Sequence, residues 1–370
     1  MTAGEHEREV RVGLADLAAD LRTLDPLDDL EDLAPLAGMV GDARIVALGE
    51  NAHFVHEFYL ARHRIVRVLV ERLGFRAFGL ESGLVEGFTV DDWVHGGEGD
   101  LDTVLTSGCT NFMGSSKEFG DQLAWMRAHN QAARSGSRTV GYFGFDSTHD
   151  LIAALGLLIA YLDRVDPDLA GFCRQELAPV AEQWDARVSA GWHFGLIERY
   201  QAMEAAVRDR WSLLLADLEL VLADRSLDYI AWSSPREFAR AQWRARSIRQ
   251  FASMYRNMPP TAYFGPVPNM TTSRNARDVF MLENIEGVLR ELGPDARIVL
   301  AAHNSHIARY PLAMKGSARE WGETEIFPGT GATMVGQYLG ARFGSPTSRS
   351  CSRPGPVTSR RGSGSRVMER

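Results

Sequence analysis

The sequence has few cysteines and no long apolar run. Cys109, Cys173 and Cys351 are an odd number, lie far apart and form no CxxC motif. We therefore expect neither a disulfide framework nor a thiolate zinc site, and we predict a cytoplasmic location. No apolar window of about 18 residues occurs, and the acidic N-terminus lacks an apolar core. Neither a transmembrane helix, a signal peptide nor a membrane partner is expected.

Two catalytic signatures are also absent. Without a GxSxG elbow, a covalent serine mechanism is disfavoured, and Ser305, between His303 and His306, is only a minor alternative. The HExxH signature of zinc proteases is missing, because His56-Glu57 is not followed by a second histidine at the required spacing. The histidines and glutamates still include enough ligand types for zinc or iron. A metal-dependent hydrolase, or a metal- or haem-binding protein, therefore stays an alternative.

The chain has no excess of positive charge. It carries 40 Lys and Arg against 48 Asp and Glu, a net charge of −8, and its isoelectric point is near 5.7. This balance argues against a nucleic-acid partner. With 370 residues, of which 45% are hydrophobic, the chain can bury a large core. One domain with an insertion, or two domains, is expected.

Four apolar runs predict strands, and a polar residue follows each of them. The runs are residues 45–48, 76–80, 139–145 and 296–302, and they lead into Glu50, Glu81, Asp146 and His303. Helical periodicity separates the strands, which favours an α/β fold with a mostly parallel sheet flanked by helices. Parallel strands end at one edge of a sheet, where ligand sites form. We expect the four polar residues to meet there.

Between the third and fourth strands the pattern is almost purely helical. We predict a helical insertion over 151–258, a lid that forms one wall of an active-site cleft. It divides the α/β domain into segments 1–150 and 259–343. Residues 344–370 are rich in Arg, Ser, Gly and Pro, so this tail is predicted to be disordered.

The segment 44–64 carries the strongest catalytic candidate. After the strand come Gly49, Glu50 and His53, and Arg62 follows on the next helix. Imidazole titrates near neutral pH, so His53 is the best candidate for a base that takes a proton from water. Glu50 and Glu81 would hold its tautomer and stabilise the imidazolium. Arg62 would bind the polarised carbonyl or orient the glutamates.

A second pair of histidines follows the last strand. His303 and His306 are candidates for donating to a developing oxyanion or for protonating a leaving alkoxide. His56 and His63 lie on the helix after His53 and are interpreted as supporting or structural residues. No role is assigned to Asp146.

Taken together, these segments resemble the erythromycin esterase family. The resemblance is carried by ALGENAHFVHEF (47–58), LARHR (60–64), GFRAFGLESG (74–83), GYFGFD (141–146), RDVFMLENI (277–285) and AAHNSHIAR (301–309). It implies an α/β sheet with an inserted helical domain, and hydrolysis of the lactone ester of a macrolide antibiotic. Water would be activated by a histidine without a metal or other cofactor, and the partner would be a small molecule.

The resemblance also implies site residues and has two departures. His53 matches the base, Glu50, Arg62 and Glu81 match the supporting charges, and His303 and His306 match the second histidine pair. The segment 109–120 matches nothing in the family, and a further strand is expected where the tail after residue 343 stands. We therefore expect a truncated or frame-shifted end, which leaves a non-catalytic paralogue as another alternative.

Overall fold

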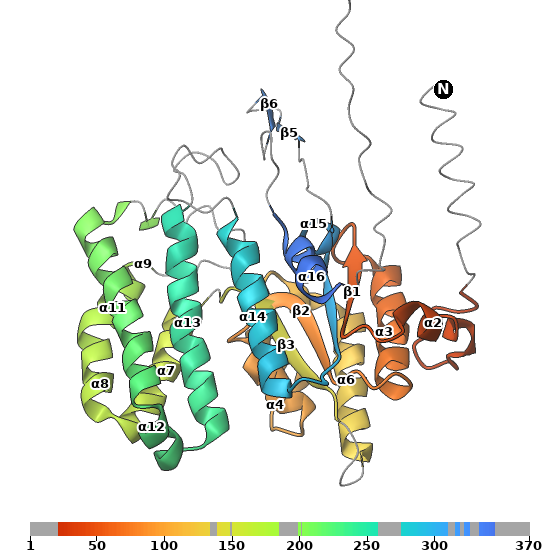
Figure 1. Cartoon of the computed structure of the whole chain (residues 1–370), viewed down its shortest axis with the longest axis horizontal. Coiled ribbons are helices and arrows are strands. Elements are labelled where there is room, and N and C mark those ends of the chain that lie inside the picture. The colour runs from red at the N-terminus through yellow and green to blue at the C-terminus, as the bar shows by residue number, and fades with distance from the viewer. Residues whose placement is uncertain are drawn as a thin grey trace, which may run out of the picture.

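A parallel four-stranded sheet lies at the centre of the computed structural model (Figure 1). The structure describes residues 21–133, 139–148, 150–184, 199–200, 202–257, 275–309, 315–318, 322–325 and 333–344. The strands are β1 (Ile45–Glu50), β2 (Ala77–Gly83), β3 (Gly141–Asp146) and β4 (Ile298–His303), in the order β1-β4-β2-β3. This sheet confirms the predicted α/β class with a mostly parallel sheet. A separate antiparallel hairpin pairs β5 (Lys315–Ala318) with β6 (Gly322–Glu325).

Helices cover both faces of the sheet. One face packs against α3 (His56–Glu71), α4 (Gly87–Val94), α5 (Leu101–Gly108) and α6 (Lys117–Ala132), the other against α14 (Ala276–Leu292) and α16 (Val335–Phe343). Side chains of β4 alternate between the two cores, with Val299 on the first side and Ile298 and Leu300 on the second. Burial on both faces explains why the strands have nearly continuous apolar sequences.

A group of helices stands beside the sheet, coloured yellow-green to green in Figure 1. They are α7 (Leu151–Val165), α8 (Pro167–Phe172), α9 (Ala178–Trp184), α11 (Ala205–Asp224), α12 (Ser226–Trp232) and α13 (Pro235–Asn257), with a π-helical turn over Cys173–Leu177. The fully buried Trp184 is at the centre of their core, with ring centroids 4.7 Å from Tyr200 and 5.0 Å from Phe251. The bounds of the inserted domain, and its role as a cleft wall, stay predictions.

The register of the strands decides which residues meet at the carboxyl edge. Glu50 lies opposite His303 in the β1–β4 pair, and Gly83 lies opposite Asp146 in the β2–β3 pair. Because β4 lies between β1 and β2, the connection through α3 crosses over β4. The carboxyl edge of the sheet therefore carries all four polar residues that were predicted to meet there, Glu50, Glu81, Asp146 and His303.

Short elements complete the described structure. They are a 3-10 turn (Glu31–Leu33), α2 (Leu36–Val40), a 3-10 turn (Met113–Ser115) and α15 (Asn304–Ile307). The buried Arg64 of α3 holds the 3-10 turn Glu31–Leu33 in place, because its guanidinium donates to both carboxylate oxygens of Asp32 at 2.7 and 2.8 Å. Among the described residues, no helix combines the length and the apolar character needed to cross a bilayer. Residues 345–370, including Cys351 and the predicted disordered tail, lie outside the described part.

Candidate active site

Glu50 and His53 form a hydrogen-bonded pair at the end of β1. Glu50 is buried, and its Oε1 lies 2.6 Å from His53 Nδ1. A carboxylate only accepts, so Nδ1–H donates and His53 Nε2 is left as the acceptor of the ring. The His53 side chain is 28% exposed, enough for this nitrogen to meet water. The tautomer required of a general base is therefore set by Glu50.

Arg62 lies behind this pair, one turn and a half into α3. Its Nη1 is 3.6 Å from Glu50 Oε2, and its Cζ is 4.0 Å from the centre of the Tyr59 ring. Burial lowers the pKa of Arg62, while Tyr59 and Glu50 favour its charged form. The Nε and Nη2 atoms of Arg62 are buried and have no hydrogen-bond partner in the described structure. The contacts of its guanidinium are therefore with Glu50 and the Tyr59 ring. Arg62 is therefore placed to orient Glu50. It is buried, so it is not placed to bind the carbonyl of a substrate.

His303 faces His53 from the end of β4, with ring centroids 5.4 Å apart. The backbone N–H of Ser305 donates to His303 Nδ1 at 3.1 Å, and Nε2 lies 3.1 Å from the carbonyl oxygen of Asn51. An amide N–H only donates and a carbonyl only accepts, so His303 is the neutral tautomer with its proton on Nε2. The site thus places a proton acceptor on His53 beside a neutral donor on His303.

Glu81 and His306 form a second, deeper charged pair. Glu81 Oε1 lies 3.2 Å from His306 Nε2, and its Oε2 accepts the backbone N–H of His303 at 2.8 Å. On the other side of the ring, Asp278 Oδ2 is 3.0 Å from His306 Nδ1. Burial lowers the pKa of His306, but the two carboxylates outweigh it and raise that pKa to about 10. The raised pKa favours the imidazolium form of His306, which holds Glu81 and through it the backbone of His303, although Arg277 Nη1 also lies 3.1 Å from His306 Nε2.

Arg277, like Asp278, is a residue of this network to which the sequence analysis gave no role. Its Nη2 lies 3.0 Å from Glu81 and 2.5 Å from Asp146, which is completely buried. Burial raises the pKa of Glu81, and the charges of His306 and Arg277 outweigh it and hold that pKa well below its ordinary value. A weak signal was present in the sequence: Arg277 and Asp278 are two adjacent charges at the start of a helix and lie before the apolar run over residues 279–282.

The remaining histidines of α3 stand outside this arrangement. His56 pairs with Glu118 at 2.6 Å, and its side chain is 60% exposed. His63 is buried against Trp125, with ring centroids 5.5 Å apart, and neither of its ring nitrogens has a hydrogen-bond partner among the described residues. Burial lowers the pKa of His63 to about 4, so its ring is neutral. The supporting or structural status expected of both residues stays a prediction.

Two exposed phenylalanines lie on segments at the ends of β1 and β2. Phe54 follows His53, with ring centroids 5.9 Å apart, and is 49% exposed, while Phe112 is 52% exposed. Both residues have positive φ, 64° and 59°. A left-handed conformation costs a non-glycine residue about 1–2 kcal/mol, so the backbone holds these rings in place against an intrinsic preference. Phe112 belongs to the segment 109–120, which Thr110 anchors by a 2.9 Å bond to the N–H of Gly83.

Metal ligation was the other predicted use of these residues. Within the described ranges, no three His, Cys, Asp or Glu side chains converge as ligands of a metal ion would. Each histidine of the site instead has a ring nitrogen engaged by a carboxylate or a backbone group. The expectation of a cofactor-free site stays a prediction.

Comparison with known proteins shows the family. The erythromycin esterase profile matches residues 70–348. The chain belongs to the erythromycin esterase family. Erythromycin esterase type I of Escherichia coli is 29% identical over 283 residues, which cover 75% of this chain and 65% of that enzyme. Type II of Escherichia coli is 36% identical over 108 residues, 29% of this chain and 24% of that enzyme.

A solved erythromycin esterase has the same fold. The mutant EreC structure, in an open conformation, superposes with a TM-score of 0.65 at 25% identity, covering 86% of this chain and 72% of that one. The match to the type I enzyme of Escherichia coli covers slightly less than two thirds of that relative's length. The matched family range includes Glu81, Arg277, His303 and His306 and begins after Arg62. Membership confirms the resemblance predicted from the sequence motifs.

Proposed function

We propose that the chain is an ester hydrolase that opens the lactone of a macrolide, or a similar cyclic ester, with water activated by His53. The observation that carries this proposal is the Glu50–His53 bond of 2.6 Å, which leaves Nε2 as an acceptor beside the donor His303. Family membership supports the ester class. Hydrolysis of a macrolide would inactivate an antibiotic and give resistance to it.

In the proposed reaction, His53 acts first as a base and then as an acid, and His303 stabilises the oxyanion. His53 Nε2 takes a proton from water as its oxygen attacks the ester carbonyl carbon, and Glu50 stabilises the imidazolium. The Nε2–H of His303 leaves the Asn51 carbonyl and donates to the oxyanion. When the carbon–oxygen bond to the alcohol breaks, His53 returns the proton to the alkoxide. The products are the carboxylic acid and the alcohol of one opened ring.

Apolar surface at the site supports a large, poorly polar substrate. Phe54, Phe58 and Phe112 each expose at least 38% of their surface and could offer apolar contacts to a ligand. Phe58 lies on the same first turn of α3 as the exposed His56. We infer that these rings contact the aliphatic face of the substrate while its ester reaches His53.

A substrate screen tests this proposal. The purified chain is incubated with erythromycin and with simple aryl and alkyl esters, with and without a chelator, and the products are followed by mass spectrometry. We expect erythromycin to gain the mass of one water at the same rate with and without chelator. Absence of any hydrolysis by protein that shows a cooperative thermal transition would contradict the ester-hydrolase proposal. Activity lost to the chelator and restored by zinc or iron would favour the metal-dependent alternative.

A further inference from the structure

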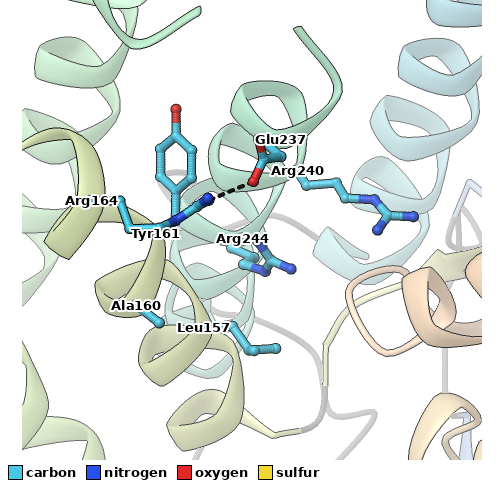
Figure 2. A pocket seen from close by; sticks show the side chains of 7 residues that line it. All are labelled: Leu157, Ala160, Tyr161, Arg164, Glu237, Arg240 and Arg244. Carbon is cyan, nitrogen blue, oxygen red and sulfur yellow. Dashed lines mark hydrogen bonds and ion pairs between the residues drawn. The ribbon is translucent and has the colours of Figure 1, made fainter. Parts of the chain in front are cut away.

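A cavity of about 270 Å³ is lined by side chains of α7 and α13 (Figure 2). Three of its lining side chains are arginines, Arg164, Arg240 and Arg244, and one is an acid, Glu237. The apolar part of the wall is formed by Leu157, Ala160 and the ring of Tyr161. None of these residues belongs to the candidate active site.

Two of the three arginines have carboxylate partners. Arg164 lies 2.5 Å from Glu237, the ion pair drawn in Figure 2. Arg240 reaches toward α4 and donates to both carboxylate oxygens of Asp92, at 2.6 and 2.9 Å. Asp92 also accepts from Arg236, at 2.8 Å, so the acid on α4 is fully engaged. Arg164 and Arg240 are therefore each already paired with an acid.

Arg244 has no such partner. It lies one helical turn after Arg240 on α13, and in the described part of the chain it makes no hydrogen bond or ion pair. Its Nε is buried, and its Cζ lies 5.8 Å from the centre of the Phe88 ring, whose other neighbour is Arg240 at 5.0 Å. Burial and the charge of Arg240 lower the pKa of Arg244 to about 10. The charge of Asp92 favours the cation but makes no ion pair with it within the described ranges, so the Arg244 guanidinium is partly removed from water and its donors can bind an anion.

We propose that this cavity binds a small organic anion, an oxyanion carried on a compact apolar group. The oxyanion would take the forked N–H donors of Arg244, with Arg164 and Arg240 adding to the field. The apolar group would lie against Leu157 and the Tyr161 ring. A cavity of 270 Å³ admits a group of about the size of a single ring, at the small end of ligand sites. Phosphomonoesters and carboxylates share this chemistry.

Calorimetric titration of the full chain with four probes tests the proposal. Phenyl phosphate and benzoate present the two oxyanions on one ring, inorganic phosphate lacks the ring, and phenol lacks the charge. We expect at least one of the two aryl anions to bind with a dissociation constant below roughly 1 mM, more tightly than inorganic phosphate, and phenol not to bind. The tighter aryl anion identifies the oxyanion that the cavity prefers.

Two charge-matched variants locate the site. Arg244→Met keeps an unbranched apolar stem and is expected to weaken aryl-anion binding by at least about tenfold. Arg256→Met removes the same charge from the exposed end of α13 and is expected to leave binding unchanged. Without ligand, Arg244→Met should melt at the same or a higher temperature than the wild type, because an unpaired cation has been removed. With the aryl anion, only the wild type and Arg256→Met should gain thermal stability.

Three results would overturn the proposal. They are binding of neither aryl anion by the wild type, equal binding of phenol, and an unchanged dissociation constant in folded Arg244→Met. None of them bears on ester hydrolysis, which depends on residues at the carboxyl edge of the sheet.

Discussion

The three histidines at the carboxyl edge of the sheet differ in what their ring nitrogens contact. His53 meets a carboxylate on Nδ1, His303 meets only backbone groups and the Ser305 hydroxyl, and His306 lies between two carboxylates. From these contacts we infer that His53 is a proton acceptor, His303 a neutral donor and His306 predominantly a cation, although all three are histidines. The sequence predicted that the three would be near one another, but their protonation states depend on partners from β1, β2 and α14.

The Ser305 hydroxyl is the first residue-scale test, because it lies 2.7 Å from His303 Nδ1. A serine nucleophile needs a base whose other nitrogen is oriented by a carboxylate, and His303 Nε2 faces the Asn51 carbonyl instead. We expect Ser305→Ala to lower kcat/KM for an ester by less than about tenfold. A loss as large as that of a nucleophile, with burst kinetics in the wild type, would contradict activated water.

The charge of His306 predicts a pH dependence of stability. Its pKa is raised from 6.5 to about 10 in the folded state, so its contribution is complete below pH 6.5 and is lost as pH rises toward 10. The pKa of Glu81 is lowered from 4.5, so its contribution is complete above pH 4.5 and is lost on acidification. Unfolding free energies of the wild type and His306→Asn, measured by denaturant titration, should therefore differ most between pH 4.5 and 6.5. A difference that does not shrink between pH 6.5 and 10 would contradict this ion pair.

Among the secondary-structure elements, α14 and α16 support the site from the side opposite α3. Asp278 of α14 binds His306 and also accepts the N–H of Val335, the first residue of α16, at 2.8 Å. Gly336 then lies so close to α15 that a Cβ there would stand 2.1 Å from the carbonyl oxygen of Ile307. The position of His306 thus depends on a close approach between two short helices.

Two glycine substitutions test this packing. Gly336→Ala must displace α16 from the Ile307 carbonyl and is expected to lower the unfolding free energy by about 1–3 kcal/mol. Gly156→Ala, on an exposed face of α7 with no atom within 4 Å of the added Cβ, should raise it by about 0.5–1 kcal/mol. Chemical denaturation measures both. A neutral Gly336→Ala would show that α16 does not fix α15.

For the whole molecule, the sequence was most informative where structure is set locally. Each predicted strand appears, and each ends at or near the polar residue that was expected, because apolar runs and helical periodicity are local signals. The position of β4 between β1 and β2 was not predictable, because pairing partners far apart in the chain leave no local signal. For the same reason Arg277, 131 residues from Asp146, was recognised as part of a motif but received no role.

The central claim is that His53, oriented by Glu50, activates water for ester hydrolysis. The most direct measurement compares kcat/KM of His53→Ala and His56→Ala on a hydrolysed ester. Both histidines lie 2.6 Å from a carboxylate and three residues apart, so His56→Ala controls for the loss of a carboxylate-paired imidazole outside the site. We predict that His53→Ala loses roughly 10²–10⁴-fold, as expected for a general base, and that His56→Ala loses less than tenfold. Retained activity in folded His53→Ala would contradict the claim.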